Sequence, residues 1–369
     1  MRIVKHIAFG VAAMGALAVL AAPSAEAQFY KGKNITMLVP VPGGSGLDLM
    51  ARTVARHMEK HIAGNPNIVP RNMPGGGGVS SLNYLSDKGR PDGLIFNFGP
   101  WNAAGVIAKL KMIRYNPSDF GFIGASSSPQ TTIMRTDVAP GMKTVDDIVK
   151  VELFNIGGRT ADRELDLAGN LALDIMGVRY RYIPGFRGMA KIKPALLGNE
   201  VQAGHSGYTG FHKFFRDGVI KEGKALALWY HSYFDINGNA LTNADITEFD
   251  AFHVVYKRVH GKMPSGDKWE AYKWLRSNIS PMSQTLFTPK GTPQAAIDAL
   301  RAAYAKLKDD PDFNRDIKKI TGIAFTFVPF DQGAKILKTF RNVSPEILAV
   351  FKEMAKKGEE NVSKKKRKK

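Results

Sequence analysis

The chain has 369 residues, enough for two domains of ordinary size with substantial cores, so a single small module is excluded. Its formal net charge of +19 favours acidic ligands or anionic surfaces, but it does not define a fold. The chain contains no cysteine, which excludes disulfides, a lipoprotein anchor and catalysis by a thiol.

The N-terminus has the pattern of a secretory signal peptide. Arg2 and Lys5 precede an apolar segment over residues 7–22, and Ala25-Glu26-Ala27 forms a small-x-small cleavage site. The apolar run is short for a membrane span, and no later run approaches about 20 apolar residues. We therefore expect removal of residues 1–27 and a soluble, periplasmic mature protein.

The first candidate site is a glycine turn between a predicted strand over residues 35–41 and a helix that begins near Leu47. Glycines let a ligand approach main-chain N–H groups closely, and Ser45 with Asp48 predicts a capping box. A helix start offers unpaired N–H donors and a positive dipole end, which favour an anion. An ordinary turn of an α/β protein is the alternative. The candidate residues are Pro42, Gly43, Gly44, Ser45, Gly46 and Asp48.

A run of four glycines at residues 75–78 follows a second short predicted strand, over residues 67–69. Such a run is too flexible for the interior of a strand or helix, so it predicts a second cradle that leads into a helix over residues 79–85. A flexible linker is the alternative. The candidate residues here are Gly76, Gly77, Gly78, Val79 and Ser80.

A third predicted strand, over residues 94–98, ends close to Trp101 and Asn102. Three strand–helix units in series predict a parallel sheet with right-handed crossovers. If the first strand lies between the second and the third, the ligand crevice falls between residues 42–46 and 99–102. Trp101 is then a candidate wall of the crevice, or else a core residue, and Asn102 is a candidate ligand residue.

Residues 120–135 change from apolar to polar and back, which suggests a crossing into a second lobe. There, a strand over residues 153–156 is followed by a turn and by a helix over residues 165–176, so a second helix start faces a candidate anion site. Arg159, Thr160 and Arg163 occupy this turn. The two arginines could clamp a carboxylate by charge-assisted hydrogen bonds, or they could pair with neighbouring acidic residues on a solvated face.

A later strand, near residues 201–204, also ends in polar residues. His205, Ser206 and Tyr208 are candidate donors to a ligand, although a histidine satisfied within the protein is an equal alternative for His205. An irregular insert follows, at about residues 231–280. It begins like a calcium loop at Asp235, but the required glycine and bidentate glutamate are missing, so we expect no metal site.

Catalytic signatures are missing from the sequence. It has no Gly-x-Ser-x-Gly elbow, no His-Glu-x-x-His pair and no Walker lysine, and its eight histidines have no convincing ligand spacing. The chain is therefore not expected to be an enzyme or to need a cofactor. The basic run from Lys364 is expected to be a disordered tail, because predicted export and the lack of interleaved aromatic residues argue against a nucleic-acid partner.

Taken in order, the motifs resemble those of the substrate-binding proteins of tripartite tricarboxylate transporters, also called Bug-type receptors. They are Val39-Pro40 with Gly43-Gly44-x-x-x-Asp48-x-x-x-Arg52, Asn72-Met73-Pro74 before the four glycines, Pro91-Asp92-Gly93, Leu197-Gly198, and Thr288-Pro289-Lys290-Gly291-Thr292-Pro293.

The resemblance implies a two-lobed α/β fold of the type II periplasmic binding proteins, each lobe a mainly parallel sheet flanked by helices, with a hinge and a ligand cleft between the lobes. The first lobe would comprise residues 28–124 and 285–357. The second lobe would comprise residues 125–284 with the insert, and residues 358–369 would form the tail.

The resemblance also implies that backbone groups of residues 42–46 and 75–80 hold one carboxylate, and that residues 157–163 and 204–208 hold the other end of the ligand. The protein would act as a monomer and deliver a small organic acid to a membrane permease, or alternatively present it to a sensor kinase. Arg159, Asp162 and Arg163 depart from the small and hydroxyl residues usual in that family, and the insert is longer than usual.

Overall fold

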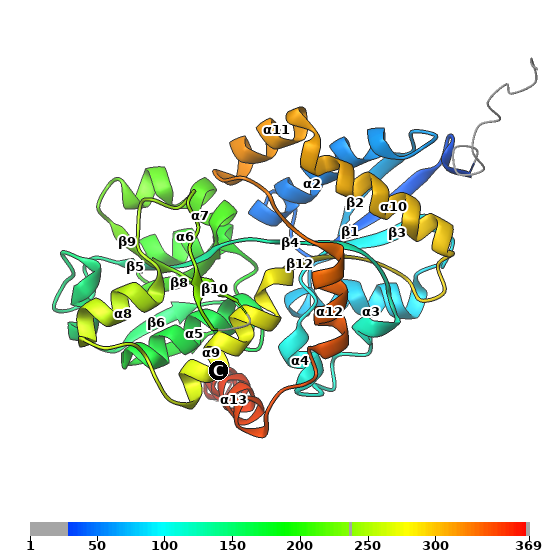
Figure 1. The fold of residues 1–369 in the computed structure, drawn as a ribbon. Coiled ribbons are helices and arrows are strands. Elements are labelled where there is room, and N and C mark those ends of the chain that lie inside the picture. The colour runs from blue at the N-terminus through cyan, green and yellow to red at the C-terminus, as the bar shows by residue number, and fades with distance from the viewer. Residues whose placement is uncertain (1–28, 236–237, 367–369) are drawn as a thin grey trace, which may run out of the picture.

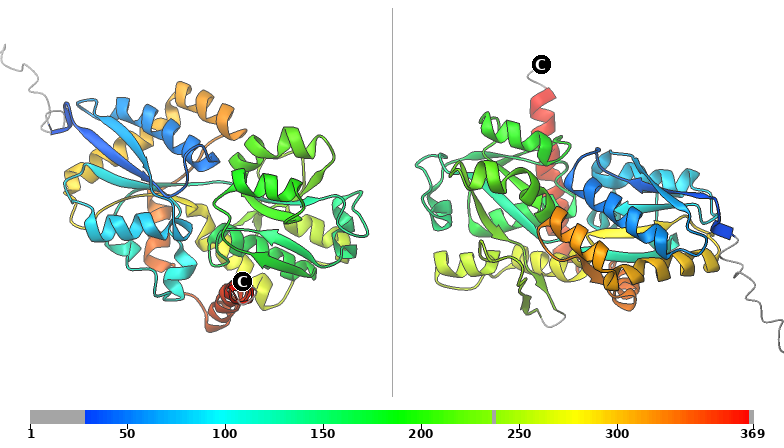
Figure 2. Two further views of the ribbon diagram at one scale, coloured as in Figure 1. Left: turned by 180° about the vertical axis from the view of Figure 1, so that it is seen from behind. Right: turned by 90° about the horizontal axis from the view of Figure 1, so that it is seen from above.

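The computed structural model describes residues 29–235 and 238–366, with side chains up to Lys357. The expected signal peptide lies outside the described residues, as do residues 236–237 of the insert and the last three residues of the basic tail. Within the described ranges, no helix has both the length and the apolar character needed to span a membrane. The chain forms two lobes that lie side by side (Figure 1), as the views from behind and from above also show (Figure 2).

The first lobe is built on a six-stranded sheet in which β1 lies between β2 and β3 and runs parallel to both, so the condition set for the predicted crevice is met. The remaining pairs are antiparallel: β12 with β3 and β4, and β13 with β4. In the order β13-β4-β12-β3-β1-β2, the strands are Thr326–Val328, Gly121–Ser127, Gln284–Thr288, Ile95–Gly99, Asn34–Val39 and Asn67–Asn72.

Strand β1 is apolar throughout its second half because both faces of the sheet are covered. Met37 and Val39 point into one core cluster together with Val54 of α2, whereas Leu38 points into the other with Leu82 of α3. The helices of this lobe are α2 (Gly46–Met58), α3 (Val79–Lys88), α4 (Ala103–Ile107), α10 (Gln294–Lys306), α11 (Pro311–Thr321) and α12 (Phe330–Thr339).

The second lobe has a five-stranded sheet in the order β7-β6-β8-β5-β9. The strands are Tyr180–Ile183, Phe154–Gly157, Ala203–Gly207, Gln130–Arg135 and Ala225–Tyr230. Strand β6 is parallel to β7 and β8, but β5 is antiparallel to β8 and β9. Both sheets are therefore mixed, whereas mainly parallel sheets were expected. The antiparallel pairs involve the strands at the crossings between the lobes: β5 enters the second lobe directly from β4, and β12 returns to the first lobe after α9.

The second sheet is covered by the helices α5 (Glu164–Met176), α6 (Met189–Leu197), α7 (Tyr208–Phe214), α8 (Phe252–His260) and α9 (Asp267–Asn278). The insert thus supplies α8 and α9, preceded by a hairpin of β10 (Tyr233–Phe234) and β11 (Ala240–Leu241). Helix α9 packs on α5, and Phe234, Trp269 and Tyr272 form an aromatic cluster. The insert is therefore an integral part of the second lobe.

The C-terminal helix α13 (Pro345–Lys366) packs on the second lobe, although the sequence suggested that it belongs to the first (Figure 1). Phe351 contacts Trp274 of α9 with ring centroids 5.8 Å apart, and Lys357 Nζ lies 2.5 Å from Asp174 of α5. The helix also continues to Lys366, where disorder was expected from residue 358. Lysine and glutamate are good helix formers, and no proline interrupts them there.

Candidate ligand-binding site

The turn before α2 is fixed by its own side chains. Ser45 caps the helix, because its Oγ accepts a hydrogen bond from Asp48 N at 3.4 Å. The buried Asp48 carboxylate accepts from Gly44 N (2.8 Å), Asn72 Nδ2 (2.8 Å) and Arg52 Nε (3.0 Å). Burial opposes ionisation of Asp48, but these hydrogen bonds prevail and hold its pKa below the usual value. Asp48 therefore shapes the turn, and both of its carboxylate oxygens accept hydrogen bonds from within the first lobe.

Gly44 was expected to offer its N–H group to a ligand, but this group donates to Asp48 instead. The glycine is still required by the backbone, because its φ of +75° lies in the left-handed region that other residues avoid. The predicted capping box is correspondingly half formed: Asp48 closes on Gly44 N, whereas a full box would place its side chain on Ser45 N.

The two lobes touch at several points around this turn. A Cβ atom on Gly46 would lie 3.0 Å from Gly210 N of α7, and one on Gly77 would lie 3.1 Å from Thr160 Oγ1. Asn102 Nδ2 donates to Asp162 Oδ2 at 2.7 Å. The described conformation is therefore closed, with the start of α2 and the second glycine turn set against the second lobe.

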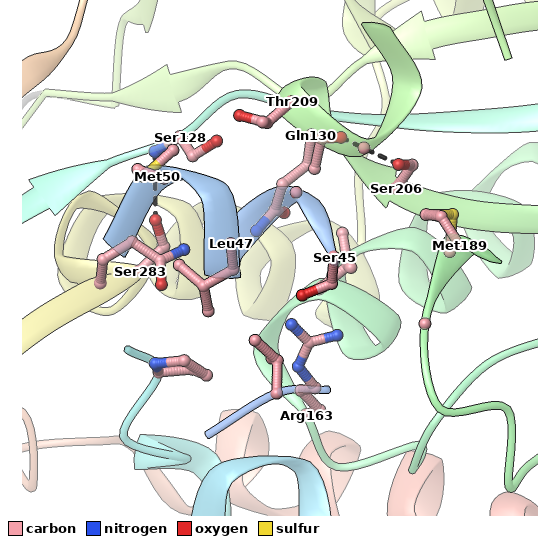
Figure 3. A pocket seen from close by; sticks show the side chains of 18 of the residues that line it. Ser45, Leu47, Met50, Ser128, Gln130, Arg163, Met189, Ser206, Thr209 and Ser283 are labelled. Atoms are coloured by element: carbon pink, nitrogen blue, oxygen red, sulfur yellow. Dashed lines mark hydrogen bonds between the residues drawn. The ribbon is translucent and has the colours of Figure 1, made fainter. Parts of the chain in front are cut away.

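A pocket of about 100 Å³ lies where α2 meets the second lobe. Figure 3 shows the side chain of Arg163 directed toward Ser45 across this pocket, so the cation and the helix start come from opposite lobes. The same pocket is also lined by Leu47, Met50, Gln130, Glu164, Leu165, Met189, Ser206, Thr209, Ser283 and Gln284.

A second pocket of about 380 Å³ adjoins the arginine turn and reaches the other glycine turn. Pro42, Gly76 and Gly77 line it from the first lobe, and Arg159 and Thr160 line it from the second. Arg159 also lines the first pocket. The structure thus brings together residues of three predicted loops around one arginine.

The two arginines are mostly withdrawn from water. The Arg163 side chain is only 15% exposed. Burial and the neighbouring charge of Arg163 lower the pKa of Arg159 to about 9, so Arg159 still carries its proton at neutral pH. The sequence left two alternatives for these arginines, a carboxylate clamp or a solvated face. In the structure they face the space between the lobes and not a solvated surface.

Several polar atoms that line these pockets have no hydrogen-bond partner among the described residues. They are Arg159 Nε, Arg163 Nε, Thr160 Oγ1, Thr209 Oγ1 and Gln284 Oε1. Buried polar groups are normally satisfied, because leaving one unpaired costs about 1–3 kcal/mol. Such a concentration between two lobes is typical of a site that a polar ligand completes.

Glu164 lines the first pocket, but its carboxylate is fully engaged behind the pocket wall. The fully buried Arg276 of the insert donates to Glu164 Oε1 at 2.8 Å, and Ser280 Oγ and Gln130 Nε2 also bond to this carboxylate. Arg276 further donates to the carbonyls of His231 (2.7 Å) and Ser232 (3.1 Å). The insert thus neutralises the acidic residue next to the arginines.

Three predicted ligand residues are core residues instead. Trp101 Nε1 donates to Met282 O at 3.1 Å, and its ring packs edge-on against Phe340. His205 is buried between Thr132 Oγ1 (3.0 Å) and Asn170 Oδ1 (3.1 Å). Tyr208 packs against other aromatic rings, and its hydroxyl donates to Glu248 at 2.5 Å.

Other candidates support the turns without lining either of the two pockets. Val79 is part of the core, and Ser80 is exposed beside the turn. A Cβ on Gly78 would lie 3.1 Å from Pro100 O, and one on Gly43 would lie 3.6 Å from Asn72 Oδ1. Asn102 acts between the lobes, through Asp162.

Sequence reasoning missed the pocket residues on the crossing segments. Gln130, Ser283 and Gln284 lie where the chain passes between the lobes, and Met50 and Met189 come from helices on either side. The polar residues at the predicted crossing were the available signal, because a segment between two lobes necessarily borders the cleft.

A larger groove of about 740 Å³ lies elsewhere, between the insert and α12. Trp274 and Ile336 contribute apolar surface to it. Its charged residues, Asp235 and Glu270 against Lys273 and Lys335, balance in sign. This groove therefore lacks the excess positive charge that an organic anion would require.

Comparisons with known proteins agree with this architecture. No family model matches the chain. A UPF0065 protein of Agrobacterium vitis is 29% identical over 182 residues, which cover 47% of this chain and about half (50%) of that relative. Among solved structures, the periplasmic binding protein BugD has a TM-score of 0.65 at 19% identity, covering 88% of this chain and 98% of its own. A TctC solute-binding protein from Polaromonas has a TM-score of 0.55 at 19% identity, covering 88% and 99%.

The fold is therefore that of the two-lobed periplasmic binding proteins. Within that class, the resemblance to the Bug-type and TctC-type receptors that the motifs indicated is confirmed. MatC from Rhodopseudomonas palustris, whose structure contains malate, has the same fold, with a TM-score of 0.60 at 16% identity over 88% of this chain and 99% of its own.

Proposed function

We propose that this protein is a periplasmic solute-binding receptor that captures a small organic carboxylate between its two lobes. The observation that carries the proposal is the pair of mostly buried arginines, Arg159 and Arg163, with unpartnered Nε atoms that line the interlobe pockets. Such a pair can hold a carboxylate by charge-assisted hydrogen bonds.

The required binding energy supports a ligand that bridges both lobes. Micromolar affinity corresponds to about 8 kcal/mol, whereas a helix terminus contributes at most about 2 kcal/mol in a favourable, partly buried geometry. The start of α2 therefore does not suffice alone. Contacts with Arg163 from the opposite lobe add the missing energy, and a ligand held by both lobes favours the closed state.

The proteins of similar fold support the chemical class. One is described with bound malate and another, from R. palustris, with adipate, and both of these ligands are carboxylates. By analogy with the receptors that the motifs resemble, the bound acid would pass to the permease of a tripartite tricarboxylate-type transporter, with the receptor acting as a monomer and not as an enzyme.

A thermal-shift screen of the purified protein tests the proposal. A ligand that binds only the folded state raises the melting temperature. At a ligand concentration 100 times the dissociation constant, it stabilises the folded state by about 2.7 kcal/mol. We expect a rise with at least one of a set of mono-, di- and tricarboxylates and none with neutral sugars. A ligand-free protein that responds to no carboxylate would contradict the proposal.

A matched pair of glycine variants locates the effect. Gly46→Ala places a Cβ 3.0 Å from the backbone of the opposite lobe and should reduce the carboxylate response. Gly218→Ala, where the nearest atom is the flexible end of Lys193 at 3.5 Å, should retain it. Equal responses of the two variants would place the acid outside the closed interface.

A further inference from the structure

The charged groups of the turn before α5 balance one another. Arg159 and Arg163 provide two positive charges, and the turn's two aspartates oppose them. These aspartates are Asp162 and Asp166. The remaining acidic residue of this segment, Glu164, already forms an ion pair with the insert. A carboxylate ligand that binds beside the arginines therefore leaves one negative charge in excess, in a place where water screens charge poorly.

Asp166 is a buried carboxylate directly behind the arginines. Its side chain is 2% exposed, and its Oδ2 atom has no hydrogen-bond partner among the described residues. Arg163 Nη1 lies 3.7 Å from Oδ2, which is beyond a normal hydrogen bond. A buried carboxylate with an unpaired oxygen is costly as an anion and much less so as a neutral acid. Asp166 is therefore the aspartate of the turn that can most easily give up its charge.

The Tyr182 hydroxyl of β7 is the other polar group next to Asp166. A Cβ on Gly158 would collide with both Asp166 Oδ1 and this hydroxyl, so the two side chains meet above that glycine. Burial and the charge of Asp166 raise the pKa of Tyr182 well above its ordinary value, so the hydroxyl keeps its proton. Burial raises the pKa of Asp166 to about 6, against the opposing effects of Arg163, Tyr182 and Arg159.

The other elements packed on α5 also bring titratable groups to this region. His205 of β8 packs against α5, and burial lowers its pKa to about 3, so its ring is uncharged at neutral pH. Arg276 of α9 is engaged with Glu164, and Lys357 of α13 is engaged with Asp174, two turns further along α5. The exchange of a proton near neutral pH therefore falls to the carboxylate behind the turn.

We infer that Asp166 takes up a proton when the acid binds, so that the receptor captures an organic anion together with one proton. The ionised form of Asp166 is supported by the charges of Arg163 and Arg159. A ligand carboxylate that pairs with these arginines brings a like charge close to Asp166, and a like charge opposes ionisation. The proton comes from the solvent and bonds to a carboxylate oxygen of Asp166, while no bond of the ligand changes.

This inference rests on the proposed carboxylate-binding function and adds a second bound species, the proton. Asp166 is a positioning residue, because it acts on the ligand through the arginines in front of it. Neutralising Asp166 restores the balance of charge in the turn and frees Arg163 for the ligand. Binding should therefore tighten as the pH falls from 7.5 toward 6.0, since the proton is a reactant.

Proton uptake by the full-length protein tests the inference directly. The probes are butyrate, benzoate, malate and tartrate, which are almost fully ionised at pH 6.0 and above. Each neutralised acid is added to unbuffered protein at pH 7.0, and the solution is titrated back to that pH. We expect more than half a proton to be taken up for each molecule of acid bound. Calorimetry should show binding at least fivefold tighter at pH 6.0 than at pH 7.5.

Asp166→Asn imitates the protonated side chain and should abolish this linkage. The variant should take up less than 0.2 protons, bind the acid at pH 7.5 at least as tightly as wild type, and change affinity less than twofold between the two pH values. Asp166→Ser, which also cannot accept the proton, replaces it if the asparagine protein does not fold.

Asp174→Asn is the matched control, because Asp174 is another mostly buried carboxylate of α5, with a side chain 8% exposed. Its hydrogen bonds with Lys268 and Lys357 outweigh the effect of burial and lower its pKa, so it stays ionised throughout this range. This variant should retain the proton uptake of wild type.

An acid that binds wild type without proton uptake, or uptake that persists in the Asp166 variants, would overturn the inference while leaving a carboxylate receptor. Loss of uptake in Asp174→Asn as well as in Asp166→Asn would also overturn it, because the proton would not be specific to Asp166. Failure of every carboxylate to bind wild type at either pH would overturn the inference together with the proposed function.

Discussion

Asn102 of the first lobe donates from Nδ2 to Asp162 Oδ2 of the second lobe, over 2.7 Å. The same side chain caps α4, because its Oδ1 accepts from Gly105 N at 3.2 Å. Asp162 directly precedes Arg163 in the chain, so this contact ties the first lobe to the arginine turn. We call the Asn102–Asp162 pair the interlobe latch.

Removing the interlobe latch should weaken ligand binding with little loss of fold stability. Asn102→Gly keeps the left-handed backbone, which Asn102 adopts with φ of 44°, and glycine is tolerated at a helix cap. A hydrogen bond to a charged group contributes about 1.5 kcal/mol or more, so we expect the dissociation constant of the acid to rise about tenfold. Calorimetry measures the affinity, and circular dichroism checks the melting temperature.

The control for this variant is Lys213→Gln, which removes a second contact between the lobes, from Lys213 Nζ to Gly44 O at 2.9 Å. Lys213 is exposed, so water replaces this contact at little cost, and affinity should change less than threefold. Equal losses in the two variants would show that Asn102 has no special role in closure.

Arg276→Gln should destabilise the protein strongly. The variant leaves the Glu164 carboxylate buried without its cation, and breaking a buried ion pair in this way costs about 3–5 kcal/mol. Urea denaturation should show a loss of this size in the free energy of unfolding. Lys273→Gln, one turn earlier on α9, removes a surface pair with Glu270 and should cost less than about 1 kcal/mol. An Arg276→Gln variant with an unchanged free energy of unfolding would refute the structural role assigned to the insert.

Asp48→Asn should loosen the first glycine turn. It places an amide where a carboxylate now accepts from Gly44 N and Arg52 Nε, so we expect a loss of about 3 kcal/mol in stability, together with weaker ligand binding. Because folding lowers the pKa of Asp48, its stabilisation is complete above the ordinary value of 3.8 and disappears as the pH falls through the folded-state pKa. The free energies of unfolding of the wild type and the variant should therefore converge at acidic pH.

The surface variant Asp87→Asn provides the comparison for Asp48→Asn. Asp87 pairs with Arg114 at 2.6 Å, and both side chains are largely accessible to solvent. Its loss should change stability by less than about 1 kcal/mol. An Asp48→Asn protein as stable as Asp87→Asn would contradict the role of Asp48 as the organiser of the turn.

His205 should make the protein less stable as the pH falls below 6.5. Burial lowers the pKa of its imidazole from 6.5 to about 3, so the unfolded chain binds the proton more readily than the folded protein does. Between pH 7 and pH 5 this costs about 2 kcal/mol. The raised pKa of Asp166, about 6, acts in the opposite direction and is present in both wild type and variant.

Urea denaturation of wild type and His205→Gln at pH 7 and pH 5 isolates this contribution, since the effect of Asp166 cancels in the comparison. Wild type should lose about 2 kcal/mol more stability than the variant over this interval. Identical pH dependence in the two proteins would show that His205 is already protonated, or is accessible to water, in the folded state.

Much of the first lobe follows from local patterns. The apolar runs and the glycine turns predicted three parallel strands, which the structure contains, and Ser45 caps α2 as expected. The arginine turn was also recognised as a candidate site. These features depend on residues close together in the chain, so periodicity and turn chemistry were sufficient to predict them.

Other features depend on contacts that no local pattern contains. His205 and Ser206 are neighbours on β8 and point to opposite faces of the sheet, so Ser206 lines the pocket while His205 packs beneath it against Gly169 of α5. Trp101 bonds to Met282, which lies 181 residues away in the chain. No pattern of neighbouring residues assigns these faces or predicts that Arg276 pairs with Glu164.

Hydrogen–deuterium exchange with and without the tightest-binding acid is the most direct test of a site between the lobes. We predict that the acid increases protection at residues 43–47 and 75–78 of the first lobe and, together with them, at residues 159–163 of the second. Protection confined to one lobe, or centred on the groove that contains Trp274 and Ile336, would contradict the account.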